Sequence, residues 1–81
     1  MIVDDEAGIR KVLGISLADR GYAVLTAENA TEALQTFDRE QPEIVLTDIK
    51  MPGMDGIELL RRLKRDNPDT EVVVITGHGD M

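Results

Sequence analysis

The chain contains no cysteine and no tryptophan, and its 81 residues include one tyrosine and one phenylalanine. The absence of cysteine excludes disulfide bonds and thiolate metal sites. No apolar run approaches the ~20 residues that a membrane-spanning helix needs, and no signal-peptide pattern opens the chain. We therefore expect a cytoplasmic domain that makes no contact with a membrane.

Basic residues are scarce, with 9 lysines and arginines against 16 aspartates and glutamates, and the formal net charge is −7. Because nucleic-acid binding depends on basic groups that displace phosphate counterions, this balance argues against direct binding of DNA or RNA. An acidic protein that handles an anionic phosphoryl group would need a cation beside it. The hydrophobic content of 42% with 31% charged residues indicates one small globular domain.

Short runs of branched apolar residues alternate with helical patterns along the chain. The apolar runs predict strands at residues 1–5, 22–27, 43–48 and 71–76. Apolar residues at three- and four-residue spacing predict a helix after each of the first three strands, with inner faces formed by Ile9, Val12, Leu13 and Leu17, by Ala33, Leu34 and Phe37, and by Ile57, Leu60 and Leu63. This alternation implies an α/β fold, in which helices cover both faces of a parallel sheet.

Polar residues follow three of the four predicted strands. Asp4 and Asp5 follow the first strand, Asp48 ends the third, and Thr76 ends the fourth. In open parallel sheets the carboxyl ends of strands meet at a switch point in strand order, so we expect these groups to converge. Converging carboxylates repel, and either a raised pKa or a bound cation relieves the repulsion. Oxygen ligands of this kind suit Mg²⁺.

Each of these residues also has a purely structural interpretation. Asp4 and Asp5 can be turn acids or a helix cap, and Asp48 can begin a turn. Thr76 alone is an ordinary strand-end threonine. For Asp55, which follows a Pro-Gly turn, we expect the structural role of starting a helix.

Asp48 is nevertheless a candidate for covalent catalysis, in which its carboxylate takes up a phosphoryl group as an acyl phosphate. The Thr76 hydroxyl and the backbone N–H of Gly77 could then donate hydrogen bonds to the phosphoryl oxygens. Glycine at position 77 would let the backbone approach closely.

Three segments together resemble the receiver domain of two-component response regulators: IVDDE at residues 2–6, IVLTDIKMPGMDG at 44–56 and VVVITGHGD at 72–80. The resemblance covers nearly the whole chain. It implies a flavodoxin-like parallel sheet of order 2-1-3-4-5, of which this chain holds the first four strands and three helices. It also implies a Mg²⁺-dependent phosphoacceptor domain of a phosphorelay, which signals to a linked or separate output domain and is not a turnover enzyme.

The resemblance assigns a role to each matching residue. Asp48 matches the phosphoacceptor, which receives its phosphoryl group from a phosphohistidine on a partner histidine kinase. Asp5 matches the direct Mg²⁺ ligand, Asp4 the assisting acid, and Lys50 the position whose backbone carbonyl completes the metal site. Thr76 matches the switch hydroxyl. The amides that would line the phosphoryl oxygens belong to Ile49, Lys50 and Gly77.

The chain departs from the receiver pattern because it stops just after its fourth predicted strand. Residues 1–81 are therefore expected to be a partial receiver without its C-terminal third, which includes a phosphate-pairing lysine. The absent lysine favours an interaction-only pseudo-receiver as an alternative. An aspartyl-phosphate phosphohydrolase is a further alternative, but Lys50 occupies the place where such enzymes commonly carry a second acid. Without a fifth strand, residues 71–76 would form an exposed edge that supports homodimerisation or segment exchange.

Overall fold

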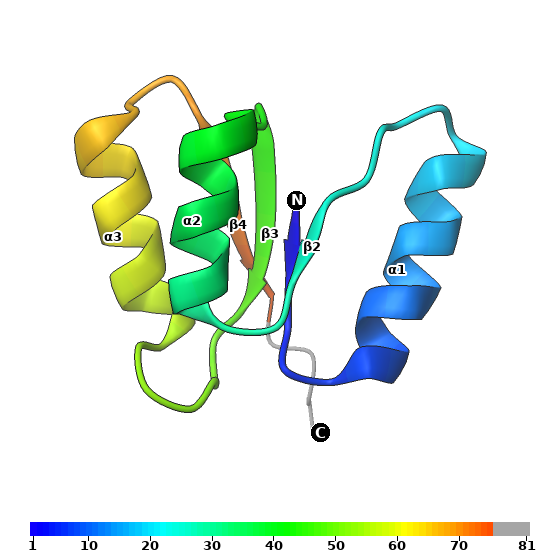
Figure 1. Ribbon diagram of the computed structural model, residues 1–81, viewed down its shortest axis with the longest axis horizontal. Coiled ribbons are helices and arrows are strands. Elements are labelled where there is room, and N and C mark those ends of the chain that lie inside the picture. Colours follow the sequence, from blue (N-terminus) through cyan, green and yellow to red (C-terminus); the bar gives the residue numbers. More distant parts are fainter. Residues whose placement is uncertain (76–81) are drawn as a thin grey trace.

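A computed structural model describes residues 1–75, which form a single parallel sheet with helices on both faces (Figure 1). The elements in chain order are β1 (Ile2–Val3), α1 (Ala7–Asp19), β2 (Thr26–Ala27), α2 (Ala30–Glu40), β3 (Ile44–Asp48), α3 (Gly56–Asp66) and β4 (Glu71–Ile75). The strand order is β2-β1-β3-β4, and every neighbouring pair is parallel. The α/β fold and the first four strands of the implied order are confirmed.

The middle of the sheet places the ends of β1 and β3 side by side. Val3 is aligned with Thr47, so the residue that follows β1 lies beside the last residue of β3. The chain passes from β1 to β2 on one side and later to β3 on the other, which makes the β1–β3 boundary the switch point in strand order. Asp4 and Asp48 therefore meet where such sheets bind their ligands.

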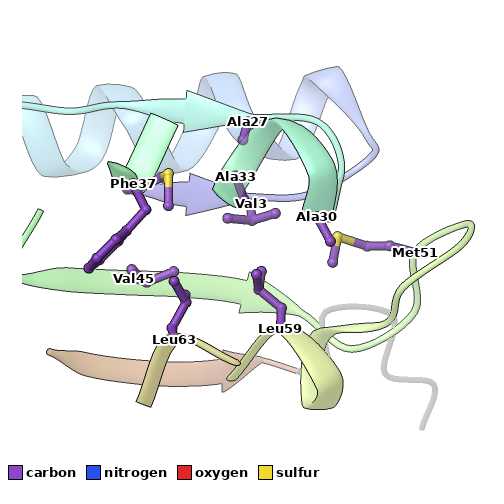
Figure 2. Close-up of a cluster of buried hydrophobic side chains, with 10 residues drawn as sticks. Val3, Ala27, Ala30, Ala33, Phe37, Val45, Met51, Leu59 and Leu63 are labelled. Carbon is purple, nitrogen blue, oxygen red and sulfur yellow. The ribbon is translucent and has the colours of Figure 1, made fainter. Parts of the chain in front are cut away.

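Helices α2 and α3 cover one face of the sheet, and their inner residues form the main hydrophobic core (Figure 2). Val3 and Val45 from the sheet are fully buried, and Phe37 is 3% exposed. Complete burial of one such side chain contributes about 1.5–3 kcal/mol. The other buried residues of this core are Met1, Ala27, Ala30, Ala33, Met51, Leu59 and Leu63.

The inner face of α3 differs from the predicted stripe. Leu59 and Leu63, four residues apart, are 0% and 2% exposed, whereas Ile57 is 40% exposed. The helix begins at Gly56, and its first turn is oriented so that Gly56 itself is buried against the sheet. The apolar residue that follows therefore points towards the surface.

Helix α1 covers the other face alone (Figure 1) and, although it lies entirely within the described part of the chain, has no buried residue. Val12 is 63% exposed and Ile15 is 54% exposed. Between this helix and the sheet lies a groove of about 520 Å³, whose apolar lining includes Leu17, Ile44 and Leu46. Among residues 1–75, no helix combines the length and the apolar character needed to cross a membrane.

The second strand is shorter than predicted, because only residues 26–27 of the range 22–27 are in a strand. The carbonyl of Leu25 still accepts a hydrogen bond from the N–H of Ile2 at 2.8 Å. Strand β1 begins at Ile2, so the preceding residues of the apolar run have no neighbouring strand with which to pair. Tyr22, at the start of that run, is 55% exposed.

Side-chain caps start the two helices that cover the core. Asn29 accepts a hydrogen bond from the N–H of Glu32 at 2.8 Å and so caps the start of α2. The carboxylate of Glu32 accepts from the N–H of Glu28 instead of from the cap residue. Asp55 caps α3 by accepting from the N–H of Glu58 at 2.9 Å, which confirms its structural role.

Candidate functional site

The end of β3 and the turn after β1 bring three carboxyl groups together. One oxygen from each of Asp4, Asp5 and Asp48 can be chosen so that the three lie within 4.8 Å of one another. Parallel pairing of β1 with β3 places residues 4 and 48 side by side, and the bend that follows β1 brings in residue 5. The strand-end acids that the sequence singled out therefore share one corner of the molecule.

The two neighbouring acids have very different surroundings. Asp4 and Asp48 are each 1% exposed, whereas Asp5 is exposed. Alternation along a strand would point adjacent side chains in different directions. Because the chain has already left β1 at this point, both residues still supply an oxygen to the same corner.

Three hydrogen bonds hold Asp4 in place, one donated by its N–H and two accepted by its oxygens. Its N–H donates to the carbonyl of Ala27 at 3.1 Å, which continues the pairing of β1 with β2. Its carboxylate accepts from the N–H of Glu6 at 2.9 Å, and its carbonyl accepts from the guanidinium of Arg10 at 2.7 Å. The structural interpretation of Asp4 as a turn acid thus holds together with its place in the cluster.

The electrostatics of the corner favour a cation. Burial raises the pKa of Asp4 above its usual range, the hydrogen bond from Glu6 opposes the shift, and the nearby charges of Asp48, Asp5 and Glu6 add to it. Two unit charges 4.8 Å apart repel by about 3–4 kcal/mol at an effective dielectric near 20, and by about 1 kcal/mol in water. Carboxylate oxygens from two strand ends are ligands of the kind that Mg²⁺ prefers, so the donor set fits this ion.

Replacing Asp4 with asparagine should stabilise the chain at neutral pH in the absence of divalent cations. Because the pKa of Asp4 is raised in the folded state, the folded state binds more protons than the unfolded state above the ordinary aspartate pKa. Stability therefore falls as the pH rises from that value through the raised pKa, and the loss is complete above it. We expect the melting temperature of Asp4→Asn at pH 7 to rise by roughly 4–8 °C, the shift that about 1 kcal/mol produces.

Thermal unfolding at several pH values in a chelating buffer measures this effect. Asp69→Asn, which removes the same charge from an exposed loop residue, is the matched control and should change the melting temperature little. A variant at position 4 that melts at or below the wild-type temperature would show that ionised Asp4 is not a source of instability.

The loop after β3 contains the next two residues of the predicted site. The carbonyl of Ile49 accepts a hydrogen bond from the N–H of Gly56 at 2.8 Å, which closes the loop onto the start of α3. Lys50 is exposed in this loop, directly after the acid-bearing strand. Thr76 and Gly77 lie outside the described residues.

Two residues around Asp48 were missed by sequence reasoning. A Cβ atom on Gly56 would fall on the carbonyl oxygen of Asp48 and lie 2.9 Å from its carbonyl carbon, so only glycine allows α3 to start this close to the strand end. Thr47 is fully buried, and its hydroxyl donates to the same carbonyl at 3.0 Å. A glycine directly after the helix cap was the one available signal, since a helix start does not itself require glycine.

Comparisons with known proteins agree on one family. The family model of the response regulator receiver domain matches residues 1–81. Sporulation initiation phosphotransferase F of Bacillus subtilis (strain 168) is 41% identical over 81 residues, which are 100% of this chain and 65% of that protein. DNA-binding transcriptional regulator NtrC of Escherichia coli (strain K12) is 41% identical over 80 residues, which are 99% of this chain and 17% of the regulator.

A solved structure gives the same result in three dimensions. Response regulator protein TrrA from Thermotoga maritima, in complex with Mg²⁺-BeF, superposes with a TM-score of 0.87 at 37% sequence identity. The match covers 90% of this chain and 64% of TrrA. This chain therefore spans less than two thirds of the TrrA chain, and 65% and 17% of the two sequence relatives.

Proposed function

This chain belongs to the response regulator receiver domain family, and from that premise we propose that it is a phosphoacceptor domain whose acceptor is Asp48. The phosphoryl donor would be a phosphohistidine on a partner histidine kinase. One observation carries the proposal: the buried carboxylate of Asp48, at the end of β3, supplies an oxygen within 4.8 Å of oxygens from Asp4 and Asp5. Because the carboxylates and the phosphoryl group are all negatively charged, Asp48 can accept a phosphoryl group in this cluster only with a cation present.

The transfer follows from the chemistry of a carboxylate nucleophile. An oxygen of Asp48 attacks phosphorus, the P–N bond to the donor imidazole breaks, and the bonding electron pair stays on the imidazole nitrogen, which takes up a proton. The product is an acyl phosphate on Asp48. Because Asp48 is only 1% exposed, its surroundings must open to admit the donor and would afterwards limit the access of water to the acyl phosphate.

The residues that would hold Mg²⁺ are Asp5 as the direct ligand, Asp4 as the assisting acid, Asp48, and Lys50 through its backbone carbonyl. When bound, the ion supplies positive charge to the phosphoryl oxygens and to the clustered carboxylates. The amides of Ile49 and Lys50 complete the part of the phosphoryl site within the described residues.

Beyond them, Thr76 would supply the switch hydroxyl and Gly77 a further amide. The Mg²⁺-BeF complex of the TrrA neighbour supports a site of this kind in the family.

The proposed role is signalling, with the chain as one part of a two-component system. The relative NtrC is a much longer protein, and its name describes a DNA-binding transcriptional regulator. By analogy, a linked or separate output domain, acting in the cytoplasm on transcription, would read the phosphorylation state of this domain. The acidic charge of −7 agrees with an output that lies outside this segment.

Intact-mass measurement after incubation with Mg²⁺ and a small acyl-phosphate donor tests this function. A receiver gains one phosphoryl group per chain, and the adduct survives acid but is removed by alkali or hydroxylamine. Omitting the divalent cation, or adding a chelator, should prevent the gain. Continuous release of phosphate from a metabolite would indicate a phosphohydrolase instead, and no uptake at all would leave an interaction-only module.

Strand β4 gives a prediction about self-association. It is an edge strand of the described sheet, and Val73 in its middle is 45% exposed. Exposed apolar edges pair with other chains, and a lysine placed on them prevents this. We expect concentration-dependent self-association of the chain in sedimentation velocity, and Val73→Lys should weaken it.

Val12→Lys is the matched control, because Val12 is 63% exposed on α1, away from this edge. It should leave the self-association unchanged. A wild-type chain that sediments as a single monomer at all concentrations, or equal effects of the two lysines, would contradict pairing through β4.

A further inference from the structure

We propose that Arg10 is a positioning residue that orients the two adjacent acids, Asp4 and Asp5, for cation binding. The inference rests on the proposed ion site and adds to it a residue from outside the acidic cluster. Its observation is the hydrogen bond from the Arg10 guanidinium to the carbonyl of Asp4 at 2.7 Å. Arg10 is half-buried and comes from α1, the helix that covers the opposite face from α2 and α3 (Figure 1).

The hydrogen bond from Arg10 is accepted by the peptide group that joins Asp4 to Asp5. The carbonyl of Asp4 and the N–H of Asp5 belong to one planar group, so holding the carbonyl fixes the rotation of that plane. The N–H of Asp4 is already held by the carbonyl of Ala27, and its carboxylate by the N–H of Glu6. The remaining rotation, which sets the direction of exposed Asp5 relative to buried Asp4, is the one that Arg10 restrains.

The same contact closes a loop between the strand and the helix. The N–H of Arg10 donates to the carbonyl of Glu6 at 3.2 Å in the first turn of α1, while its side chain returns to Asp4. The turn that carries Asp5 is thus bounded by the end of β1 and by a residue whose backbone is helical. Groups that orient metal ligands in this way typically change metal affinity by 10–100-fold when they are removed.

The sign of the effect separates positioning from simple electrostatics. A guanidinium bonded to the turn that carries Asp4 and Asp5 repels a divalent cation bound there, so loss of its charge alone would tighten Mg²⁺ binding. Loss of its hydrogen bond would free the Asp4–Asp5 peptide and weaken binding. We expect the second effect to prevail, because an ion such as Mg²⁺ demands near-ideal placement of its ligands.

Calorimetric titration of the chain with Mg²⁺ at constant ionic strength tests the inference. Arg10→Ala should raise the Kd for Mg²⁺ by roughly tenfold. Lys11→Ala is the matched control, since it removes the same charge from the next residue of α1, which is exposed. It should change the Kd by no more than about twofold, and towards tighter binding.

Arg10→Lys completes the series, and it also carries the test should Arg10→Ala fail to fold. Lysine keeps the charge but lacks the planar fork of the guanidinium. Its Kd should therefore lie above the wild-type value and below that of Arg10→Ala. A circular-dichroism melt of each variant shows that the fold is retained.

The failures of the two proposals are distinguishable. Suppose that the wild-type chain binds Mg²⁺ and that the folded Arg10→Ala variant, or Arg10→Lys in its place, binds it equally well or more tightly. This result would overturn the role of Arg10 but would not contradict the ion site. A wild-type chain that binds no Mg²⁺ would overturn the ion site and the inference together.

Discussion

Asp48→Asn should take up no phosphoryl group from a small acyl-phosphate donor, although the chain remains folded. An amide oxygen or nitrogen is a poor nucleophile towards phosphorus, so we expect the rate of uptake to fall at least about a hundredfold and the mass to stay unmodified. Asparagine has nearly the shape of aspartate, and Asp48 is 1% exposed, so the packing at the end of β3 should change little. Intact-mass spectrometry over a time course measures both rate and stoichiometry.

The same substitution relieves repulsion in the acidic corner. Asp48 is among the charges that raise the pKa of Asp4, so removing it should bring the pKa of Asp4 closer to its ordinary value. The variant should then melt at a higher temperature than the wild type in a chelating buffer at neutral pH. Loss of phosphoryl uptake with retained or increased stability would show that the Asp48 carboxylate is needed for the reaction and not for the fold.

Asp55→Asn is the matched control for this variant. Asp55 is an exposed acid seven residues further along the chain, where it caps α3, and asparagine is about equally good in that position. It should take up phosphoryl groups as the wild type does. Stoichiometric, hydroxylamine-labile uptake by Asp48→Asn would show that another side chain is the acceptor.

Among the glycines within residues 1–75, Gly56 is the one whose replacement by alanine should cause the largest loss of stability. The new Cβ would collide with the carbonyl of Asp48 and lie 3.1 Å from the Cα of Ile49, so it meets backbone that cannot rotate away. Either α3 moves outward or the end of β3 shifts. Overpacking of this kind costs typically 1–3 kcal/mol, and we expect about 3 kcal/mol here because both partners are main chain.

The substitution also links stability to the site. A shift at the end of β3 moves Asp48, so the surviving folded protein should take up phosphoryl groups more slowly than the wild type. Gly8→Ala is the matched control, because a Cβ on Gly8 would meet nothing within 4 Å in α1. Alanine there should stabilise the helix by roughly 0.5–1 kcal/mol.

Urea denaturation of both glycine variants gives the comparison. Equal midpoints for Gly56→Ala and the wild type would mean that α3 starts further from β3 than the structure shows. A Gly8→Ala variant that is also strongly destabilised would point to a general intolerance of α1 or of the fold, not to contact with the strand end.

The order of strands and helices along the chain was predictable from the sequence, because the spacing of apolar residues differs between a buried strand and a helix. Branched apolar runs separated by helical patterns specify parallel strands with helical crossovers, and the acids sit where those strands end. The position of Asp48 beside Asp4 follows from the pairing of β1 with β3, in which Val3 is aligned with Thr47; the resemblance to receivers implied this strand order. The resemblance to receivers then supplied the chemical roles, which remain proposals.

Features that depend on contacts between distant segments were not predictable. Apolar residues 22–25 resemble a strand, yet pairing needs a neighbour, and β1 begins only at Ile2. The predicted inner face of α3 includes Ile57 and omits Leu59, because spacing alone does not show which side of a helix meets the sheet. The contacts of Gly56 with Asp48, and of Arg10 with Asp4, likewise join separate elements.

The exposure of α1 gives the acidic corner a second significance. A helix of 13 residues is marginal by itself, and this one has no buried residue to anchor it within the described structure. It should therefore be among the first elements to open locally, without global unfolding. Arg10 joins this helix to the peptide between the two acids. A cation bound at the acidic cluster and a closed α1 would therefore stabilise each other, and the fraction of closed α1 would rise as the cation site fills.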